Sequence, residues 1–315
     1  MSSNIKQLFV PEVYLGPNCN NRCSFCSLNK EDFPRKSAED VRKELKIIKK
    51  FADDVKFTGG EVTIRPNIMQ IISYAKSLGF KNICIESNGG KFSDKEYARK
   101  MIKSGANIFS VFIYGHKPKL HEKLTGVKGS FGETVSGIKN LVRYAGNVLN
   151  VEVIVAITKL NYKYLSEIAK FSWKLGVGHV TLSFATACGS LLINKEAIPT
   201  ISDVITYITD VLNTFSDRNM GISYIPPCFL EGHEKYINFI KIPSKMVIKN
   251  PNFTMIIESE LKKNMLKGST CKKCRFDDIC YGLWKEYANL YGLNELKPVL
   301  GRKVKTLEQF EKEFC

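Results

Sequence analysis

Short apolar runs alternate with amphipathic stretches along the first two thirds of the chain. Six runs rich in Val, Ile and Phe have the length of buried strands, and each is followed by apolar residues at helical spacing. The predicted strands span residues 12–15, 55–58, 83–86, 108–114, 151–157 and 179–184. The predicted helices span residues 41–52, 68–78, 97–101, 135–145, 165–175 and 202–215. Six β-then-α units of this kind imply parallel strands joined by right-handed crossovers.

This rhythm fits an open sheet and a barrel equally well, but about 220 residues for six units suit a partial barrel. The rhythm breaks after Gly221, and residues 221–292 hold four prolines and four cysteines. The expected fold class is therefore α/β, a partial (β/α)6 TIM-type barrel over residues 1–220 with a small C-terminal subdomain over 221–292. A tail over 293–315 is basic up to Lys305 and is predicted to be helical from Thr306.

The composition is that of an ordinary globular protein, with 44% apolar and 25% charged residues. It excludes a wholly disordered chain, a collagen-like fibre and a disulfide-rich mini-protein. No stretch approaches the roughly 18 apolar residues of a membrane span. The first residues lack the charged-then-apolar order of a signal peptide. We therefore expect a cytoplasmic protein that does not contact a membrane.

The net charge is +16, from 47 Lys and Arg against 31 Asp and Glu. So large a charge favours anionic partners, such as nucleic acid, an acidic peptide, a phosphorylated metabolite or an acidic electron donor. No run of five like charges is present, so the blander interpretation, lysines spread over solvated helices, is favoured. Nucleic acid is not an expected partner, because no aromatic-rich basic motif is visible.

Ten cysteines in a chain without an export signal indicate metal binding or catalysis rather than disulfides. Structural zinc takes four ligands, often as two separated pairs, which three thiols within eight residues do not match. Three such thiols match three irons of a four-iron cluster and leave the fourth iron open. The N-terminal trio is Cys19, Cys23 and Cys26; a second trio is Cys271, Cys274 and Cys280, and Cys228 lies between them.

The stretches NCNNRCSFC at 18–26 and FTGGE at 57–61, with the six-unit rhythm, resemble the radical SAM superfamily over roughly residues 10–220. The resemblance implies that Cys19, Cys23 and Cys26 hold a [4Fe-4S] cluster whose open iron chelates S-adenosylmethionine. Reductive cleavage would then give a 5′-deoxyadenosyl radical that takes a hydrogen atom from the substrate. A flavodoxin- or ferredoxin-type protein would supply the electron.

The same resemblance assigns residues to S-adenosylmethionine. Phe25 would pack on adenine, or would simply anchor its loop in the core. Gly59 and Gly60 would let the backbone approach the ligand, and Glu61 would accept from the methionyl ammonium. Asn88 would contact the cofactor or form an Asn-Gly turn. Ser110 is a weak candidate for the ribose, because Phe112 occupies the register where many relatives have serine.

Four histidines and two lone cysteines remain. The segment 115–126 carries His116 and His121, which we expect to be solvated loop residues, as we do the other two histidines. Cys188 follows the sixth predicted strand, at the substrate end of the barrel, where it could donate a hydrogen atom or be a buried small hydrophobe. Cys84 is expected in the core.

The second trio resembles the auxiliary-cluster region of relatives with SPASM or twitch subdomains. The SPASM pattern has another Cys four residues after the third, where this chain has Trp284, so one auxiliary [4Fe-4S] cluster is expected. With the first cluster this makes two. The first candidate for the fourth ligand of the auxiliary cluster is Cys228, and the second is Cys315. The third possibility is that the fourth iron of this cluster is open. A structural zinc bound by Cys228, Cys271, Cys274 and Cys280 is the alternative.

Three functional hypotheses follow. The leading one is a radical SAM enzyme that cross-links, epimerises or oxidises a ribosomally made peptide. The strand pattern begins by residue 12, however, so we expect no leader-peptide-binding domain ahead of the barrel. The second is a small-molecule dehydrogenase or cyclase of antibiotic or cofactor synthesis; residues 58–65, TGGEVTIR, are similar to the molybdopterin-pathway cyclases. The third is a non-catalytic, basic, zinc-bearing RNA-binding protein.

Overall fold

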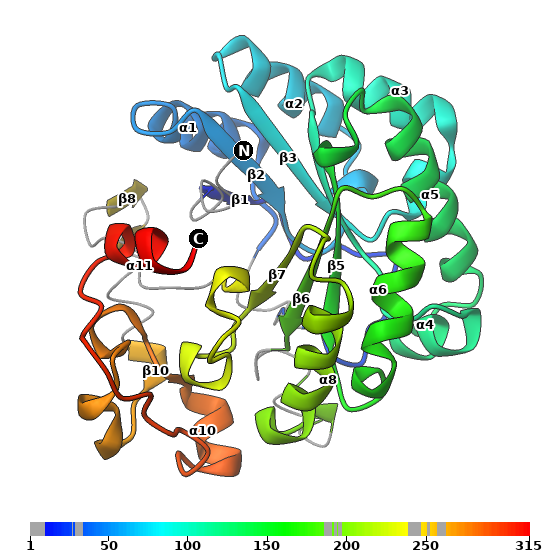
Figure 1. The fold of residues 1–315 in the computed structure, drawn as a ribbon. Coiled ribbons are helices and arrows are strands. Elements are labelled where there is room, and N and C mark those ends of the chain that lie inside the picture. The colour runs from blue at the N-terminus through cyan, green and yellow to red at the C-terminus, as the bar shows by residue number, and fades with distance from the viewer. Residues whose placement is uncertain are drawn as a thin grey trace.

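Seven parallel strands form one open sheet in the computed structural model (Figure 1). The structure describes residues 10–26, 28, 34–185, 191, 194, 197–238, 247–250, 253–256 and 263–315. The strands lie in the order of the sequence and neighbouring strands pair in parallel. They are β1 (Glu12–Tyr14), β2 (Asp54–Thr58), β3 (Asn82–Ser87), β4 (Ile108–Phe112), β5 (Val151–Ile157), β6 (His179–Phe184) and β7 (Met220–Ser223). The expected partial barrel is confirmed.

Helices cover one face of this sheet, as alternation along the strands requires. Val55, Phe57, Ile83 and Ile85 have no more than 1% exposure and pack under the helices. These helices are α1 (Ala38–Ile48), α2 (Ile68–Ser77), α3 (Lys95–Ser104), α4 (Pro118–Thr125), α5 (Ser130–Tyr144), α6 (Leu165–Lys174) and α8 (Ile201–Thr214). The opposite face carries the alternate residues of each strand, and many of these are polar.

Two elements differ from the sequence-based expectation. The strand β7 adds a seventh strand, so the boundary expected between residues 220 and 221 falls inside it. The segment expected as a loop after β4 contains α4, with Pro118 in its first turn and Gly126 in the left-handed conformation at its end. Leu120 and Leu124 of α4 pack toward the core at helical spacing.

The C-terminal part consists of short elements beside the barrel (Figure 1). They are the hairpins β8 (Val247–Asn250) with β9 (Phe253–Ile256) and β10 (Met265–Leu266) with β11 (Leu283–Trp284), and the helices α10 (Lys285–Tyr291) and α11 (Leu307–Phe314). Thr306 caps α11, as expected. The Tyr287 hydroxyl accepts from the Ile201 amide, which fixes α10 against α8. No helix in the described ranges is long and apolar enough to cross a bilayer.

Candidate active site

The first cysteine trio lies on the loop that leaves β1 at the carboxyl end of the sheet, where α/β barrels place their chemistry. Cys19, Cys23 and Cys26 are all partly buried and form no disulfide. The Cys26 amide donates to the Cys23 carbonyl at 3.3 Å, and the Asn21 amide donates to Cys19 Sγ at 3.3 Å. Burial raises the pKa of Cys23 to about 12, with help from negative charge on Cys19 and Cys26. The three thiols are therefore close neighbours, as three ligands of one cluster must be.

The end of β2 holds the start of this cysteine loop by direct backbone contact. The Gly60 amide donates to the Gly16 carbonyl at 2.9 Å, and the Glu61 amide donates to the Asn18 carbonyl at 2.7 Å. A Cβ on Gly60 would lie 2.3 Å from the Asn18 carbonyl oxygen. Gly59 has φ +150°, and a Cβ there would meet Gly16 O at 2.7 Å. Both glycines are thus explained by packing against residues 16–18.

The Glu61 carboxylate ties the end of β2 to the end of β3. It is 4% exposed and accepts from the Thr63 amide at 3.0 Å and the Thr63 hydroxyl at 2.5 Å. It also accepts from the Ser87 hydroxyl at 2.8 Å and the Asn88 amide at 2.6 Å. Burial raises the pKa of Glu61, and these hydrogen bonds oppose that rise. The carboxylate is therefore already engaged by four donors of the protein.

Two further contacts clamp the cysteine loop. The Asn88 side chain donates to Asn20 Oδ1 at 2.7 Å, which joins the loop after β3 to it. From the other side, the C-terminal end of α4 accepts from the loop: the Arg22 amide donates to Thr125 O at 2.8 Å, and the Ser24 amide donates to Leu124 O at 3.4 Å. These bonds satisfy carbonyls that a helix end leaves without partners.

Aromatic packing also supports the loop that carries the first three cysteines. Phe25 is 7% exposed and meets Tyr114 edge-on, with ring centroids 4.8 Å apart. Tyr114 stacks on Phe112 and lies against His121 of α4. His121 is 1% exposed and its Nδ1 accepts from the Tyr114 amide, so it is not the solvated loop residue expected from the sequence. Burial lowers its pKa to about 4. Pro118 and Gly126, which are typical of the start and the end of a helix, could have predicted α4 and with it the burial of His121.

The sheet face opposite the helices carries an acidic polar network. Thr58 Oγ1 donates to Glu86 at 2.7 Å, and Lys56 Nζ lies 3.8 Å from Glu86 and 3.2 Å from Glu12. On the neighbouring strands Glu152 accepts from Ser110 Oγ at 2.8 Å and from Thr181 Oγ1. Within the described network, three carboxylates therefore face one lysine.

Two more candidate site residues have defined places in the structure, and a third lies outside the described residues. Ser110 lies deep in this network and is 2% exposed, and its hydroxyl donates a hydrogen bond to Glu152. Cys84 is 5% exposed and lies 3.6 Å from Ser110 Oγ, in the core as expected. Cys188 lies outside the described residues. The sequence reasoning missed Tyr114, which continues the alternation of Ser110 and Phe112 just beyond the end of β4.

The second trio and Cys228 line one pocket in the C-terminal part of the chain, together with Phe276, Lys267 and Lys297. Burial raises the pKa of Cys228, and negative charge on Cys280, Cys274 and Cys271 raises it further. Burial also raises the pKa of Cys280 to about 11. Cys315 is exposed at the end of α11 and does not line this pocket. Among the described residues, no group of three or more His, Cys, Asp or Glu side chains is arranged to hold a single metal ion.

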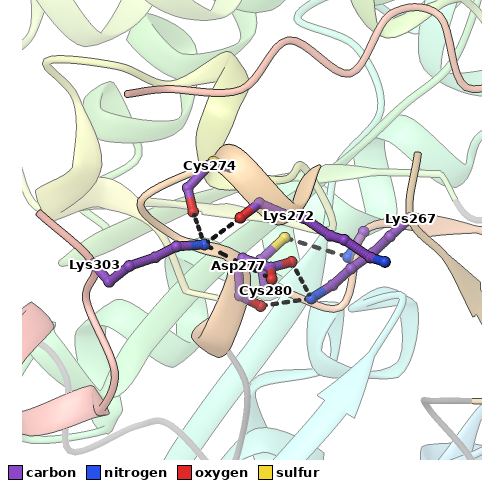
Figure 2. A network of polar contacts seen from close by, with 7 residues as sticks. Lys267, Lys272, Cys274, Asp277, Cys280 and Lys303 are labelled. Carbon is purple, nitrogen blue, oxygen red and sulfur yellow. Dashed lines mark hydrogen bonds and ion pairs between the residues drawn. The ribbon is translucent and has the colours of Figure 1, made fainter. Parts of the chain in front are cut away.

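Two lysines fix the loop that carries these cysteines (Figure 2). Lys303 Nζ donates to the carbonyls of Lys272 and Cys274 at 2.7 and 2.8 Å. Lys267 Nζ donates to Asp277 Oδ1 at 2.9 Å and to the Asp277 carbonyl. The pocket walls are thus held by lysines from before and after the trio in the sequence.

Solved structures share this fold across most of the chain. SuiB of Streptococcus suis, bound to S-adenosylmethionine, matches with a TM-score of 0.61 at 17% identity, over 94% of this chain and 77% of SuiB. The structure titled "Native anSMEcpe with bound AdoMet and Kp18Cys peptide" matches with a TM-score of 0.61 at 11% identity, over 90% and 94% of the two chains. At these identities the likeness concerns the fold.

Curated relatives match the barrel part. A probable GTP 3′,8-cyclase of Saccharolobus islandicus is 28% identical over 167 residues, which are 52% of this chain and 53% of that protein. The corresponding protein of Thermococcus kodakarensis is 29% identical over 169 residues. The match spans about half the length of these relatives.

The family comparison covers the part that holds the clamped cysteine loop. A model of the radical SAM superfamily matches residues 13–172, which is slightly more than half of the chain. The matched region runs from β1, through the three-cysteine loop and the Gly-Gly-Glu segment, into α6. Membership implies a [4Fe-4S] cluster and S-adenosylmethionine, and the three neighbouring thiols of the loop fit that cluster. This chain belongs to the radical SAM superfamily.

Proposed function

We propose that this enzyme modifies a ribosomally made peptide and that Cys19, Cys23 and Cys26 hold the cluster that binds S-adenosylmethionine. The bound cofactors supply a 5′-deoxyadenosyl radical that removes a hydrogen atom from the substrate. The protein positions the thiols through the contacts of Gly60, Asn88 and α4. We also propose that four residues help to bind the cofactor by holding the surrounding loops and strands in place. They are Phe25, Gly59, Glu61 and Ser110.

The acidic face of the sheet is the feature on which we base the proposal of a peptide substrate. Glu12, Glu86 and Glu152 on this face add negative charge to the barrel, which would disfavour a triphosphate more than a peptide. Structures of SuiB and anSMEcpe with peptides, whose fold this chain shares, support the same choice.

We also propose an auxiliary [4Fe-4S] cluster in a twitch-like subdomain that follows β7, with Cys228 as its fourth ligand. Four thiols surround a pocket here instead of meeting at one point, which suits a cluster of several atoms better than one zinc ion. Cys228 lies with the trio, whereas Cys315 does not line the pocket.

A small-molecule reaction is the second candidate. The curated relatives support it, because those matched are named probable GTP 3′,8-cyclases. The spacing of the second cysteine trio is tighter than expected for that family. The third hypothesis, a non-catalytic RNA-binding protein, is wrong, because the chain belongs to an enzyme superfamily.

The substrate class can be tested by following hydrogen transfer. The reconstituted enzyme would be incubated with S-adenosylmethionine, dithionite and either GTP or a deuterated candidate peptide, chosen by searching the gene's neighbourhood for short open reading frames. We expect deuterium from the peptide to enter 5′-deoxyadenosine, and no product from GTP. Conversion of GTP, with an inert peptide, would establish the second candidate instead.

A further inference from the structure

Positive charge is concentrated in the C-terminal part of the chain. Residues 263–306 contain ten Lys and Arg against four Asp and Glu, so they carry +6 of the net +16 within about a seventh of the sequence. The wide spread of lysines expected from the sequence therefore does not describe this segment. A local excess of this kind produces a field that draws anionic partners to one face.

Eight of these cations are exposed, and five of the eight lie in residues 272–273 and 297–305. Lys267 and Lys303 are committed to the network that holds the cysteine loop (Figure 2). In the described part of the chain, none of the five forms an ion pair with a carboxylate. We call these five residues the basic patch: Lys272, Lys273, Lys297, Arg302 and Lys305.

Backbone pairing brings the members of the basic patch together around the auxiliary pocket. The Arg275 amide donates to Val299 O at 2.7 Å, and the Val304 amide donates to Arg275 O at 2.8 Å. Residues 297–305 therefore run beside the loop that carries Lys272 and Lys273. Lys297 itself lines the pocket with the four cysteines. The patch thus borders the place where the auxiliary cluster is proposed.

An apolar side chain lies inside this patch. Leu300 is 72% exposed, the highest value among the large apolar side chains described. A single exposed leucine is ordinary by itself, but here it lies between Lys297 and Arg302. A protein partner can cover an aliphatic group of this kind, whereas single-stranded nucleic acid binds where aromatic rings offer stacking.

We propose that the basic patch docks an acidic one-electron carrier protein of the flavodoxin or ferredoxin type. The inference rests on the proposed auxiliary cluster, because docking here would place the carrier beside its four thiols. The reduced carrier would give one electron to the cluster, so the carrier is oxidised and the cluster reduced by one electron, and no bond is formed or broken. Complementary charge speeds such an encounter and sets its orientation, and salt weakens it.

The test uses the holoenzyme, an acidic flavodoxin, and the variant Arg302→Glu/Lys305→Glu, which leaves the pocket lining intact. The control is Lys100→Glu/Lys103→Glu on α3, which makes the same charge change with two exposed, unpaired lysines on the far side of the sheet (Figure 1). We expect the first variant to bind flavodoxin roughly tenfold more weakly at low ionic strength, and the control to bind as the wild type does. High salt should remove the difference.

Activity with two reductants adds a second readout. 5′-Deoxyadenosine formation driven by reduced flavodoxin should fall in Arg302→Glu/Lys305→Glu and stay unchanged with dithionite. Equal weakening in the control, no flavodoxin binding by the wild type, or loss of RNA binding alone on a poly(U) probe would each overturn the proposal. Zinc in place of the second four irons would refute the auxiliary cluster and with it the electron transfer, whereas eight irons without patch-dependent binding would refute the docking alone.

Discussion

At the scale of single residues, Gly59 and Gly60 show how a family motif is explained by packing. Both glycines lie where the end of β2 touches the start of the cysteine loop, and Gly60 leaves no room for a side chain. The motif therefore positions the loop of three thiols whether or not its backbone also meets a ligand.

Gly60→Ala should accordingly displace the cysteine loop. We expect iron bound after anaerobic reconstitution to fall by about half and 5′-deoxyadenosine formation to be lost, while helical content measured by circular dichroism stays near that of the wild type. Gly132→Ala in α5 is the matched control, since nothing lies within 4 Å of a Cβ there. Normal iron content and cleavage in Gly60→Ala would contradict this account of the glycine.

Glu61→Ala tests whether its carboxylate serves the fold or the cofactor. Removing it leaves four donors, three of them buried, without this acceptor, which should cost on the order of 3 kcal/mol of unfolding free energy in urea titrations. Calorimetry with S-adenosylmethionine on the same variant measures the expected contact with the methionyl ammonium. A variant of unchanged stability with weaker cofactor affinity would favour that direct contact over the tie between β2 and β3.

At the scale of elements, the sequence pattern predicted β1 to β6 because each of these segments carries buried Val, Ile, Leu or Phe. It missed β7, whose four residues carry only two large apolar side chains, Met220 and Ile222, on either side of Gly221. It missed α4 because only Leu120 and Leu124 among its eight residues are large aliphatic side chains. The clamp on the cysteine loop was likewise hidden, since bonds such as Asn20 to Asn88 join residues far apart in the sequence.

The buried histidine of α4 predicts a pH dependence of stability. His121 has an ordinary pKa of 6.5 when unfolded and about 4 when folded, so between these values the unfolded chain binds more protons. The contribution of neutral His121 to the free energy of unfolding is complete above pH 6.5. It is lost at about 1.4 kcal/mol per pH unit as the pH falls toward 4.

His121→Gln keeps an acceptor for the Tyr114 amide but does not titrate. Urea unfolding at several pH values should therefore show a shallower loss of stability between pH 6.5 and 4 in this variant than in the wild type. Parallel curves for the two proteins would mean that His121 is not held neutral by burial.

At the scale of the whole molecule, the chain carries two separate groups of cysteines, one in the barrel and one beside it. Replacing Cys271, Cys274 and Cys280 together by Ala should halve the iron from about eight to about four per chain. Some uncoupled cleavage of S-adenosylmethionine should remain, because the first trio lies in another part of the fold, while substrate turnover should be lost. Metal analysis giving four irons and one zinc in the wild type would refute the second cluster.

The central claim is that the clamped loop of β1 holds the cluster that cleaves S-adenosylmethionine. The most direct measurement is 5′-deoxyadenosine release by the reconstituted wild type and by Cys19→Ala, Cys23→Ala and Cys26→Ala, each under dithionite. All three thiols are needed for one open-site cluster, so we predict release by the wild type and none above background by any variant. Release at the wild-type rate by even one of the three variants would contradict the claim.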